Sequence, residues 1–419
     1  MIRAMMIGLA VAMALGAAAL AAEEPGQAPA AKSDGATPAA VKSPLADPNF
    51  FPITVWMQSG RNAAKYQAIG VNTYVAADPG DLAALKKLGM YAICVGDEKN
   101  LGYKDDPTII AWMHGDEPDN AQDIKQWKSA EDIKKAWPES PDQPLEKWGS
   151  YGPPIPPSAI VADYQKIKAA DPTRPVLLNL GQGVAWEGYH GRGYRSGKLE
   201  DYPEYIKGCD LVSFDIYPVN HDKPAVKDKL EMVAQGVDRL VKWTGGKKSA
   251  WDCIECTDMG GTGQKPTPSQ VKTEVWMSLI HGSKGLVYFV HIFKPQFNEP
   301  GVLADKEMSE AIGKVNKRIT ELAPVLNSPT VADGATVTSS AGEKAPVDLM
   351  VKRSGEATYV FAVDMRPVET KGSFEVKGLP AKATAEVLGE GRKVEVTDGK
   401  FADEFKGYEV HLYMITAAK

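Results

Sequence analysis

From about residue 50 onward, short apolar runs alternate with longer stretches that have helical spacing. The apolar runs are rich in Val, Ile, Tyr and Phe, which is typical of strands buried on both faces of a parallel sheet. Eight such runs lie at 52–58, 72–77, 91–96, 109–114, 175–181, 211–217, 249–255 and 285–290. The helical stretches, several of which end in glycine as a helix C-cap does, are 61–69, 80–88, 159–170, 225–243, 268–282 and 305–323. This alternation predicts an α/β fold, a closed (β/α)8 TIM barrel over residues 49–326.

A doubly wound open sheet is the alternative arrangement of the same elements. Such a sheet normally carries a glycine-rich phosphate loop after its first strand. The residues that follow the first run, Gln58-Ser59-Gly60-Arg61, do not have that pattern. The closed barrel is therefore the favoured fold.

The pattern changes after Leu326. Residues 330–419 contain short runs with alternating apolar and polar positions, separated by Gly, Asp and Lys. Runs of this kind are 348–352, 358–363, 385–388 and 410–415. They predict a small C-terminal antiparallel β-sandwich of about ninety residues, without a cluster of catalytic residue types.

Residues 120–158 interrupt the barrel rhythm after the fourth run and contain Trp127, Trp137 and Trp148. As an extra loop after a barrel strand, the segment is expected to lie over the carboxyl-terminal rim, where loops shape substrate clefts. The alternative is that the tryptophans only hold an irregular loop against the barrel.

The chain begins with one cation, an apolar stretch and small residues up to Ala22, which predicts a secretory signal peptide over 1–22. A membrane anchor is the competing interpretation, but this Ala/Gly-rich stretch is marginal for a stable membrane span. Residues 23–48, rich in Ala, Pro, Gly, Lys and Ser, predict a disordered linker. We therefore expect a secreted or periplasmic protein, with no membrane attachment after cleavage.

Charge and cysteine content restrict the partners. The 419 residues have a formal net charge of −6 and no basic stripe, so nucleic acid is not an expected partner. Cys253 and Cys256 could form a disulfide, a redox pair or half of a metal site, but no second Cys or His pair at ligand spacing supports zinc. Because the two positions would face opposite sides of a strand, we expect buried free thiols and no metal.

Two glutamates each follow an apolar run and are the candidate catalytic residues. Glu117 lies in Gly115-Asp116-Glu117-Pro118 after the fourth run, and Glu255 ends the seventh. Residues that end different strands of a parallel barrel meet at one rim. Two carboxyl groups about 5 Å apart, one protonated and one ionised, are what retaining glycoside hydrolysis requires.

This arrangement resembles the clan of retaining β-glycosidases with (β/α)8 barrels, which includes the family 5, family 42 and agarase-type enzymes. In that clan an acid/base Glu, usually within Asn-Glu-Pro, ends strand four, and a nucleophilic Glu ends strand seven. The resemblance covers roughly residues 50–325 and implies that Glu117 is the acid/base and Glu255 the nucleophile. Asp116 stands in place of the usual Asn, and its charge would raise the pKa of Glu117.

Further candidates for substrate contact follow from the same strand ends. The resemblance assigns Tyr217 to hydrogen-bond the nucleophile, and Asp215 shares its face of the sixth strand. Asn179 ends the fifth strand and could contact sugar hydroxyls, whereas His114 precedes Glu117 by three residues.

Aromatic residues are the expected platforms for sugar rings. The Trp that the clan usually places on strand eight is absent, so Tyr288, His291 or Phe293 must replace it. Trp56, near the end of the first run, and Trp186, in the loop after the fifth, could also stack on a sugar ring.

These observations together predict an exported glycoside hydrolase that cleaves β-glycosidic bonds of an oligo- or polysaccharide with retention and without a cofactor. One alternative is a non-catalytic carbohydrate-binding barrel, favoured by Asp116 and by the absent strand-eight Trp. Another is a metal-dependent hydrolase on the same barrel, for which the sequence offers only His114 and Asp215 as ligands.

Overall fold

The computed structural model describes residues 43–418. The predicted signal peptide and all but the last residues of the predicted linker lie outside this range, so those predictions remain untested. Residues Ser43–Lys419 form one compact unit. The division of this unit into a barrel domain and a sheet domain at residues 326–330 stays a prediction.

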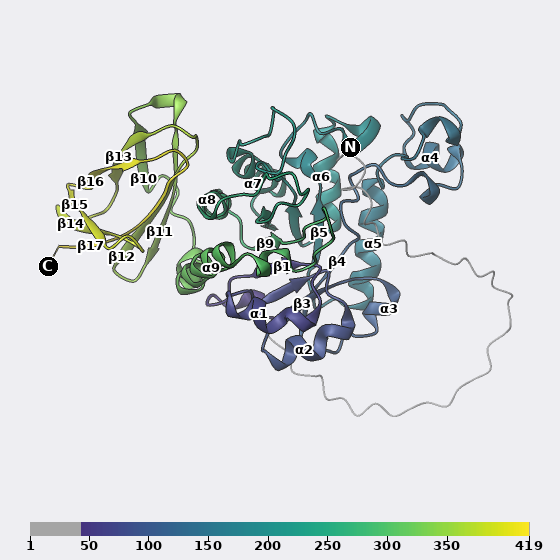
Figure 1. The fold of residues 1–419 in the computed structure, drawn as a ribbon, viewed down its shortest axis with the longest axis horizontal. Coiled ribbons are helices and arrows are strands. Elements are labelled where there is room, and N and C mark those ends of the chain that lie inside the picture. Colours follow the sequence, from purple (N-terminus) through teal and green to yellow (C-terminus); the bar gives the residue numbers. More distant parts are fainter. Residues whose placement is uncertain (1–42, 419) are drawn as a thin grey trace. The chain divides into compact units, whose positions relative to one another are not determined.

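The first sheet confirms the predicted barrel (Figure 1). Its parallel strands are β1 (Ile53–Trp56), β2 (Thr73–Val75), β3 (Tyr91–Val95), β4 (Ile109–Met113), β5 (Val176–Leu180), β6 (Leu211–Phe214), β7 (Ser249–Ala250), β8 (Asp252–Glu255) and β9 (Leu286–Phe289). They follow the order β7-β6-β5-β4-β3-β2-β1-β9-β8. A parallel bridge between Asp215 and Cys253 joins the β6 and β8 ends, so the sheet closes on itself. The predicted seventh strand is present as β7 and β8, interrupted at Trp251.

Side chains alternate between the inside and the outside of the barrel. One apolar cluster, which includes Ile93, Met113 and Cys253, fills the interior. A second cluster, which includes the neighbouring Cys94 and Ile254, packs between the strands and the helices. Because both faces of each strand are buried, the strands are nearly unbroken runs of apolar residues, as the sequence indicated.

The helices surround the barrel strands (Figure 1). They are α1 (Ala63–Ala68), α2 (Leu82–Lys87), α3 (Glu98–Leu101), α4 (Ala130–Ala136), α5 (Pro157–Ala170), α6 (Tyr202–Tyr205), α7 (Glu231–Thr244), α8 (Pro268–Ile280) and α9 (Lys306–Leu326). Six of these nine helices correspond to predicted ones, whereas α3, α4 and α6, of four to seven residues, do not. The start of α8 is set by a capping box between Thr267 and Gln270.

The C-terminal residues form an eight-stranded antiparallel sheet, β10-β13-β16-β15-β14-β17-β12-β11. Its strands are β10 (Ala335–Ser339), β11 (Val347–Ser354), β12 (Ala357–Asp364), β13 (Thr370–Val376), β14 (Lys382–Val387), β15 (Arg392–Thr397), β16 (Lys400–Phe405) and β17 (Val410–Ala417). Because β15 and β16 pair only at Thr397 and Lys400, the sheet folds over at this hairpin into two layers. Phe374 and Phe401 stack at 4.6 Å between these layers, against Tyr413.

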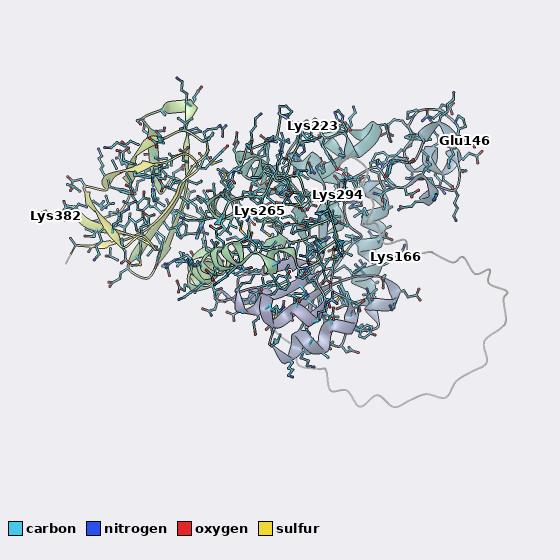
Figure 2. The ribbon with its side chains drawn as sticks, viewed as in Figure 1. Glu146, Lys166, Lys223, Lys265, Lys294 and Lys382 are labelled. Carbon is cyan, nitrogen blue, oxygen red and sulfur yellow. The ribbon has the colours of Figure 1, made fainter. Side chains whose placement is uncertain are left out.

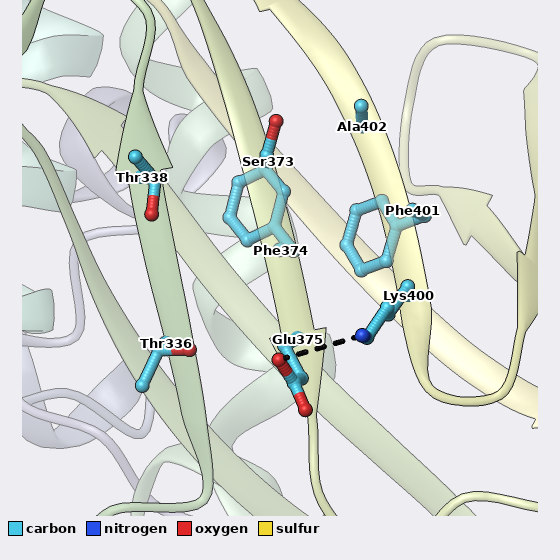
Figure 3. Close-up of a pocket in the computed structure, with 8 residues that line it drawn as sticks. All are labelled: Thr336, Thr338, Ser373, Phe374, Glu375, Lys400, Phe401 and Ala402. Carbon is cyan, nitrogen blue, oxygen red and sulfur yellow. Dashed lines mark ion pairs between the residues drawn. The ribbon is translucent and has the colours of Figure 1, made fainter.

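Two further features of the surface are visible in the figures. Charged side chains such as Glu146, Lys166 and Lys382 project outward from the insertion at residues 120–158, from α5 and from β14 (Figure 2). A shallow depression of about 430 Å³ lies over β10, β13 and β16 (Figure 3). Its lining includes hydroxyl groups and the Glu375–Lys400 ion pair. A single carboxylate does not provide the two acids that glycoside hydrolysis requires, so this depression is not the candidate active site.

Within the described residues no helix is both long and apolar enough to span a membrane.

Candidate active site

The loop after β4 carries Glu117 in a sharp turn. Glu117 has φ 42°, a left-handed conformation that is uncommon for a residue with a side chain. The turn is anchored two residues later by Asp119, which is fully buried and accepts hydrogen bonds from Gly181 N (2.8 Å) and from the Tyr202 hydroxyl (3.1 Å). An unusual backbone conformation that the surroundings hold in place is typical of functional sites.

Glu117 lies within a group of three acids and one amide. The Asn179 side chain donates to Asp116 Oδ1 (2.9 Å) and to Asp215 Oδ1 (3.2 Å). The Glu117 carboxyl group hydrogen-bonds Asp215 directly. We call these four residues the acid cluster: Asp116, Glu117, Asn179 and Asp215. All four come from the carboxyl ends of β4, β5 and β6, so the structure brings together side chains that are up to 99 positions apart, between Asp116 and Asp215.

The acids of this cluster hold protons more strongly than free acids do. The pKa of Glu117 is raised well above its ordinary value by desolvation and then by the charges of Asp215 and Asp116. Desolvation and the neighbouring Asp215 also raise the pKa of Asp116 to about 7, although Asp116 is exposed to solvent. Like charges that share a site cannot all ionise. The cluster therefore holds at least one proton at neutral pH.

Asp215 is the member best placed to stay ionised. Burial raises its pKa, but the hydrogen bond from Asn179 and the neighbouring polar groups of Cys253, Glu117 and Tyr217 act in the opposite direction. Hydrogen bonds donated to a carboxylate favour its charged form. The two environments therefore favour different protonation states, with Glu117 as the protonated acid and Asp215 as the carboxylate.

The structure places Tyr217 beside Asp215. Tyr217 is 4 % exposed, and the pKa of its hydroxyl is raised well above the ordinary value by burial and then by the charge of Asp215. The sequence predicted correctly that Asp215 and Tyr217 share a face.

Glu255, the predicted partner of Glu117, is buried rather than open to solvent. Glu255 has no exposed surface, and its oxygens accept hydrogen bonds from Val219 N (2.6 Å), Asn220 N (2.9 Å) and Asn220 Nδ2 (2.5 Å). The charges that chiefly raise the pKa of Glu117 come from Asp215, Asp116 and Asp119. Because the loop after β6 folds across the end of β8, the carboxyl group of Glu255 is covered, and Asp215 is the carboxylate in contact with Glu117.

Two of the predicted substrate contacts point away from the acid cluster. His114 is buried, and its Nε2 lies 2.7 Å from Gly208 O, outside the barrel strands. Tyr288 is 1 % exposed, and its hydroxyl donates to Asn316 Oδ1 on α9 (2.8 Å). Both residues are at outward positions of their strands, so the prediction that they contact substrate is wrong for this conformation.

The remaining predicted platforms differ in accessibility. Trp56 is 5 % exposed and packs in the barrel interior, whereas Trp186 is partly exposed. His291 is buried, with its Nε2 3.2 Å from the Gln58 amide nitrogen. Its ring belongs to an aromatic group after β9, the rings of which are 5.2–6.1 Å apart: Phe289, His291, Phe293 and Phe297. Phe289 contacts Tyr217 at 5.3 Å, so this group extends outward from the acid cluster.

Sequence reasoning missed Asn120 and Tyr189. Asn120 Nδ2 donates to Glu117 Oε2 (2.7 Å) and lies 3.4 Å from the Tyr189 hydroxyl. Tyr189 packs against Trp186 at 6.4 Å. Asn120 follows Glu117 by only three residues, and Tyr189 lies in an aromatic loop, but no local pattern shows that the two loops meet.

The tryptophans of the insertion hold that segment in place. Trp137 Nε1 donates to Pro154 O (2.8 Å), and the rings of Trp137 and Trp148 lie 6.0 and 5.7 Å from Tyr194. The Arg195 guanidinium lies 4.7 Å above the Trp137 ring. These contacts support the structural interpretation of Trp137 and Trp148.

All four cysteines are buried and free, as predicted for Cys253 and Cys256. Cys253 faces the barrel interior, and the Cys256 thiol donates to Phe289 O (3.1 Å). Among residues 43–418, no group of three or more His, Cys, Asp or Glu side chains is placed to hold a metal ion.

Comparisons with known proteins identify the fold. No family model matches the sequence, and no curated protein matches it. Among solved structures, an α-amylase of Geobacillus thermoleovorans complexed with acarbose aligns over 89 % of this chain and 99 % of its own, with a TM-score of 0.51 and 11 % identity. The E323A mutant of Gan42B, a family 42 β-galactosidase of G. stearothermophilus, aligns over 87 % and 98 % (TM-score 0.51, 8 % identity). The maltose complex of AmyP aligns over 90 % and 99 % (TM-score 0.52, 9 % identity). At these identities the likeness establishes a TIM barrel with a C-terminal β domain.

Proposed function

We propose that this protein is a glycoside hydrolase that uses Glu117 as the general acid. The observation that carries the proposal is the direct contact between the Glu117 and Asp215 carboxyl groups, which lie at the ends of β4 and β6 in environments that separate their protonation states. The fold supports it, because the aligned barrels include amylases with bound acarbose or maltose and a β-galactosidase. The expected substrate is an oligo- or polysaccharide.

The two acids would perform a double displacement. In the first step the Asp215 carboxylate attacks the anomeric carbon, the glycosidic C–O bond breaks, and Glu117 gives its proton to the leaving oxygen. In the second step water attacks the anomeric carbon, Glu117 takes a proton from it, and the bond to Asp215 breaks. No cofactor is required, since both steps use only carboxyl groups and water.

The contact between the acids supports retention of configuration over inversion. Inverting enzymes need a gap of about 6.5–9.5 Å between the carboxyl groups to hold a water molecule. Carboxyl groups in hydrogen-bond contact leave no such gap, so we infer retention with Asp215, rather than Glu255, as the nucleophile. Specificity for β-linked sugars rests on the resemblance of the Asp116-Glu117-Pro118 segment to Asn-Glu-Pro.

Export is part of the proposal, on the strength of the apolar start of the chain, which lies outside the described residues. The expected location is the periplasm or the exterior of the cell. Cleavage after about residue 22 could be read from the N-terminal sequence of the mature protein.

The proposal is tested with aryl β-glycosides of several sugars and with matched variants of the two acids. We expect Glu117→Gln and Asp215→Asn each to reduce kcat/KM by at least about 10²-fold, since the first removes the general acid and the second removes the nucleophile. Proton NMR of the first-formed product distinguishes retention from inversion. Lack of turnover by the wild type on every sugar would refute the proposal.

A carbohydrate-binding barrel without turnover is the second candidate. It is favoured by the burial of Glu255, which leaves the usual nucleophile position of the resembled clan inaccessible. Saturable binding of an oligosaccharide by a wild type that does not hydrolyse it would establish this candidate.

A further inference from the structure

Glu255 lies where the loop after β6 crosses the end of β8. Three N–H groups of this loop, Val219 N, Asn220 N and Asn220 Nδ2, donate to its two oxygens at 2.5–2.9 Å. A carboxylate that accepts several N–H bonds holds a loop more firmly than a neutral acceptor does, because charge-assisted hydrogen bonds are stronger.

Asn220 extends this contact to the loop after β8. Its Nδ2 also donates to Thr257 O (2.9 Å), and its Oδ1 accepts a hydrogen bond from Met259 N (3.0 Å). Glu255 and Asn220 together, which we call the Glu255–Asn220 bridge, therefore join the loops that follow the sixth and seventh barrel strands.

The bridged loop leads directly from the acid cluster. Tyr217, which lies beside Asp215, precedes Val219 by two residues. On the other side of the bridge, His221 Nε2 lies 3.0 Å from Gln182 Oε1, and its ring meets Trp186 edge-on at 5.3 Å. The Glu255–Asn220 bridge therefore fixes the positions of Tyr217 and Trp186 relative to Asp215.

Glu274 supports Glu255 from the helix side. Glu274, on α8, has no exposed surface, and its carboxyl group lies next to that of Glu255, so that each affects the pKa of the other. No N–H group donates to either oxygen of Glu274, whereas three donate to Glu255. Two adjacent ionised carboxylates would repel each other in this buried site, and Asp252 adds to the repulsion. Glu274 is therefore the member that keeps a proton and donates it to Glu255.

We propose that Glu255 is a positioning residue, which fixes the loop after β6 and thereby sets the geometry of Tyr217 and Asp215. The catalytic consequence rests on the proposed function. The bridge itself is a statement about structure and can be tested without any substrate.

The first test is amide hydrogen exchange on Glu255→Gln and Asn220→Ala. A glutamine offers one oxygen in place of two and turns an NH2 group toward an N–H donor. We expect the amides of residues 219, 220 and 259 to exchange at least about tenfold faster in both variants, while the amides of β1–β5 keep their protection. Unchanged exchange in this loop would overturn the proposal, whether or not the protein has glycosidase activity.

The second test separates positioning from nucleophilic catalysis. Asp215→Ala should lose nearly all activity on an aryl β-glycoside and regain part of it with azide, because a small anion can enter the vacated space and attack the anomeric carbon. Glu255→Gln should retain about 1–10 % of wild-type kcat, and azide should not restore the loss. Rescue of Glu255→Ala by azide, with a glycosyl azide as product, would make Glu255 the nucleophile and overturn the proposal. A wild type that is inactive on all substrates refutes the proposed function alone, and the exchange experiment then decides the bridge.

Glu274→Gln provides the matched control. Its amide can still donate to the Glu255 carboxylate, as a protonated Glu274 does, so loop exchange should remain within about threefold of wild type. If Glu274→Gln loosens the loop as much as Glu255→Gln does, the assigned direction of this hydrogen bond is wrong and the bridge proposal fails.

Discussion

Asn179 joins Asp116 and Asp215 through a single amide nitrogen, which donates to Asp116 at 2.9 Å and to Asp215 at 3.2 Å. Its oxygen accepts a hydrogen bond from Ser213 Oγ (2.7 Å), which fixes the orientation of the amide. An amide held in this way can stabilise two neighbouring carboxylates at once. Asn179 therefore controls how protons are shared within the acid cluster.

Replacement of Asn179 by Ala should weaken catalysis through Asp215. Without the N–H donor, the pKa of Asp215 rises further, so less of it is ionised at a given pH. We expect the acid side of the pH profile of kcat/KM to move to higher pH, with a loss of about 10-fold to 100-fold at its optimum. Asn72→Ala, at a polar site near the start of β2 that lies outside the cluster, is the control and should leave the profile in place. An unshifted profile in Asn179→Ala would contradict this role.

Replacement of Asp116 by Asn should move the alkaline side of the profile. The charge of Asp116 raises the pKa of Glu117, and the reaction requires Glu117 in its protonated form. Removal of that charge lowers the pKa of Glu117, so activity should be lost at a lower pH than in the wild type. The measurement is kcat/KM from pH 5 to about 9 on one aryl glycoside. A shift toward higher pH would be the opposite of this expectation.

Replacement of Glu117 by Gln should affect substrates unequally. A good leaving group departs without protonation, so kcat/KM for a dinitrophenyl glycoside should fall much less than for a methyl glycoside or a disaccharide. We expect a difference of at least about 10²-fold between the two classes. Equal losses for both would assign Glu117 to substrate binding rather than to acid catalysis.

Replacement of Tyr288 by Phe should leave activity unchanged and lower stability. The Tyr288 hydroxyl donates to Asn316 on α9, away from the acid cluster. Its loss leaves a buried acceptor without this partner, at a cost of about 1–2 kcal/mol in the free energy of unfolding. Urea denaturation measures the stability, and KM for any substrate shows whether the sugar contacts this side chain. A raised KM would contradict this expectation and indicate that the Tyr288 side chain contacts the sugar.

His281 should make stability depend on pH in the alkaline range. It lies between Asp238 (2.9 Å) and Asp348 (3.3 Å), and these carboxylates raise its pKa from 6.5 to about 9 against the effect of burial. Because the folded state holds the proton more tightly than the unfolded state, the stabilisation is complete below about pH 6.5 and is lost as the pH rises through about 9. Thermal denaturation of His281→Gln should show a smaller loss of Tm between pH 6.5 and 9 than the wild type. Parallel curves would exclude the contribution.

The sequence predicted the barrel well and the site only in part. Every barrel strand was located, because strands buried on both faces need continuous apolar runs, as in Ile109–Met113. The strand-end rule also placed Asp116, Glu117, Asn179 and Asp215 at one rim. The rule could not decide whether Asp215 or Glu255 is the partner of Glu117, since both residues end a strand and both carry a carboxyl group.

The alternation of apolar and polar positions along the chain determined the fold class, the order of the elements and the free state of Cys253 and Cys256. Only the tertiary structure decided which acids meet. Hydrophobic periodicity is a local property, whereas the solvent access and protonation of a carboxyl group depend on what covers it. Glu255 is covered by Val219 and Asn220 from the sixth-strand loop, and Asp215 is left in contact with Glu117.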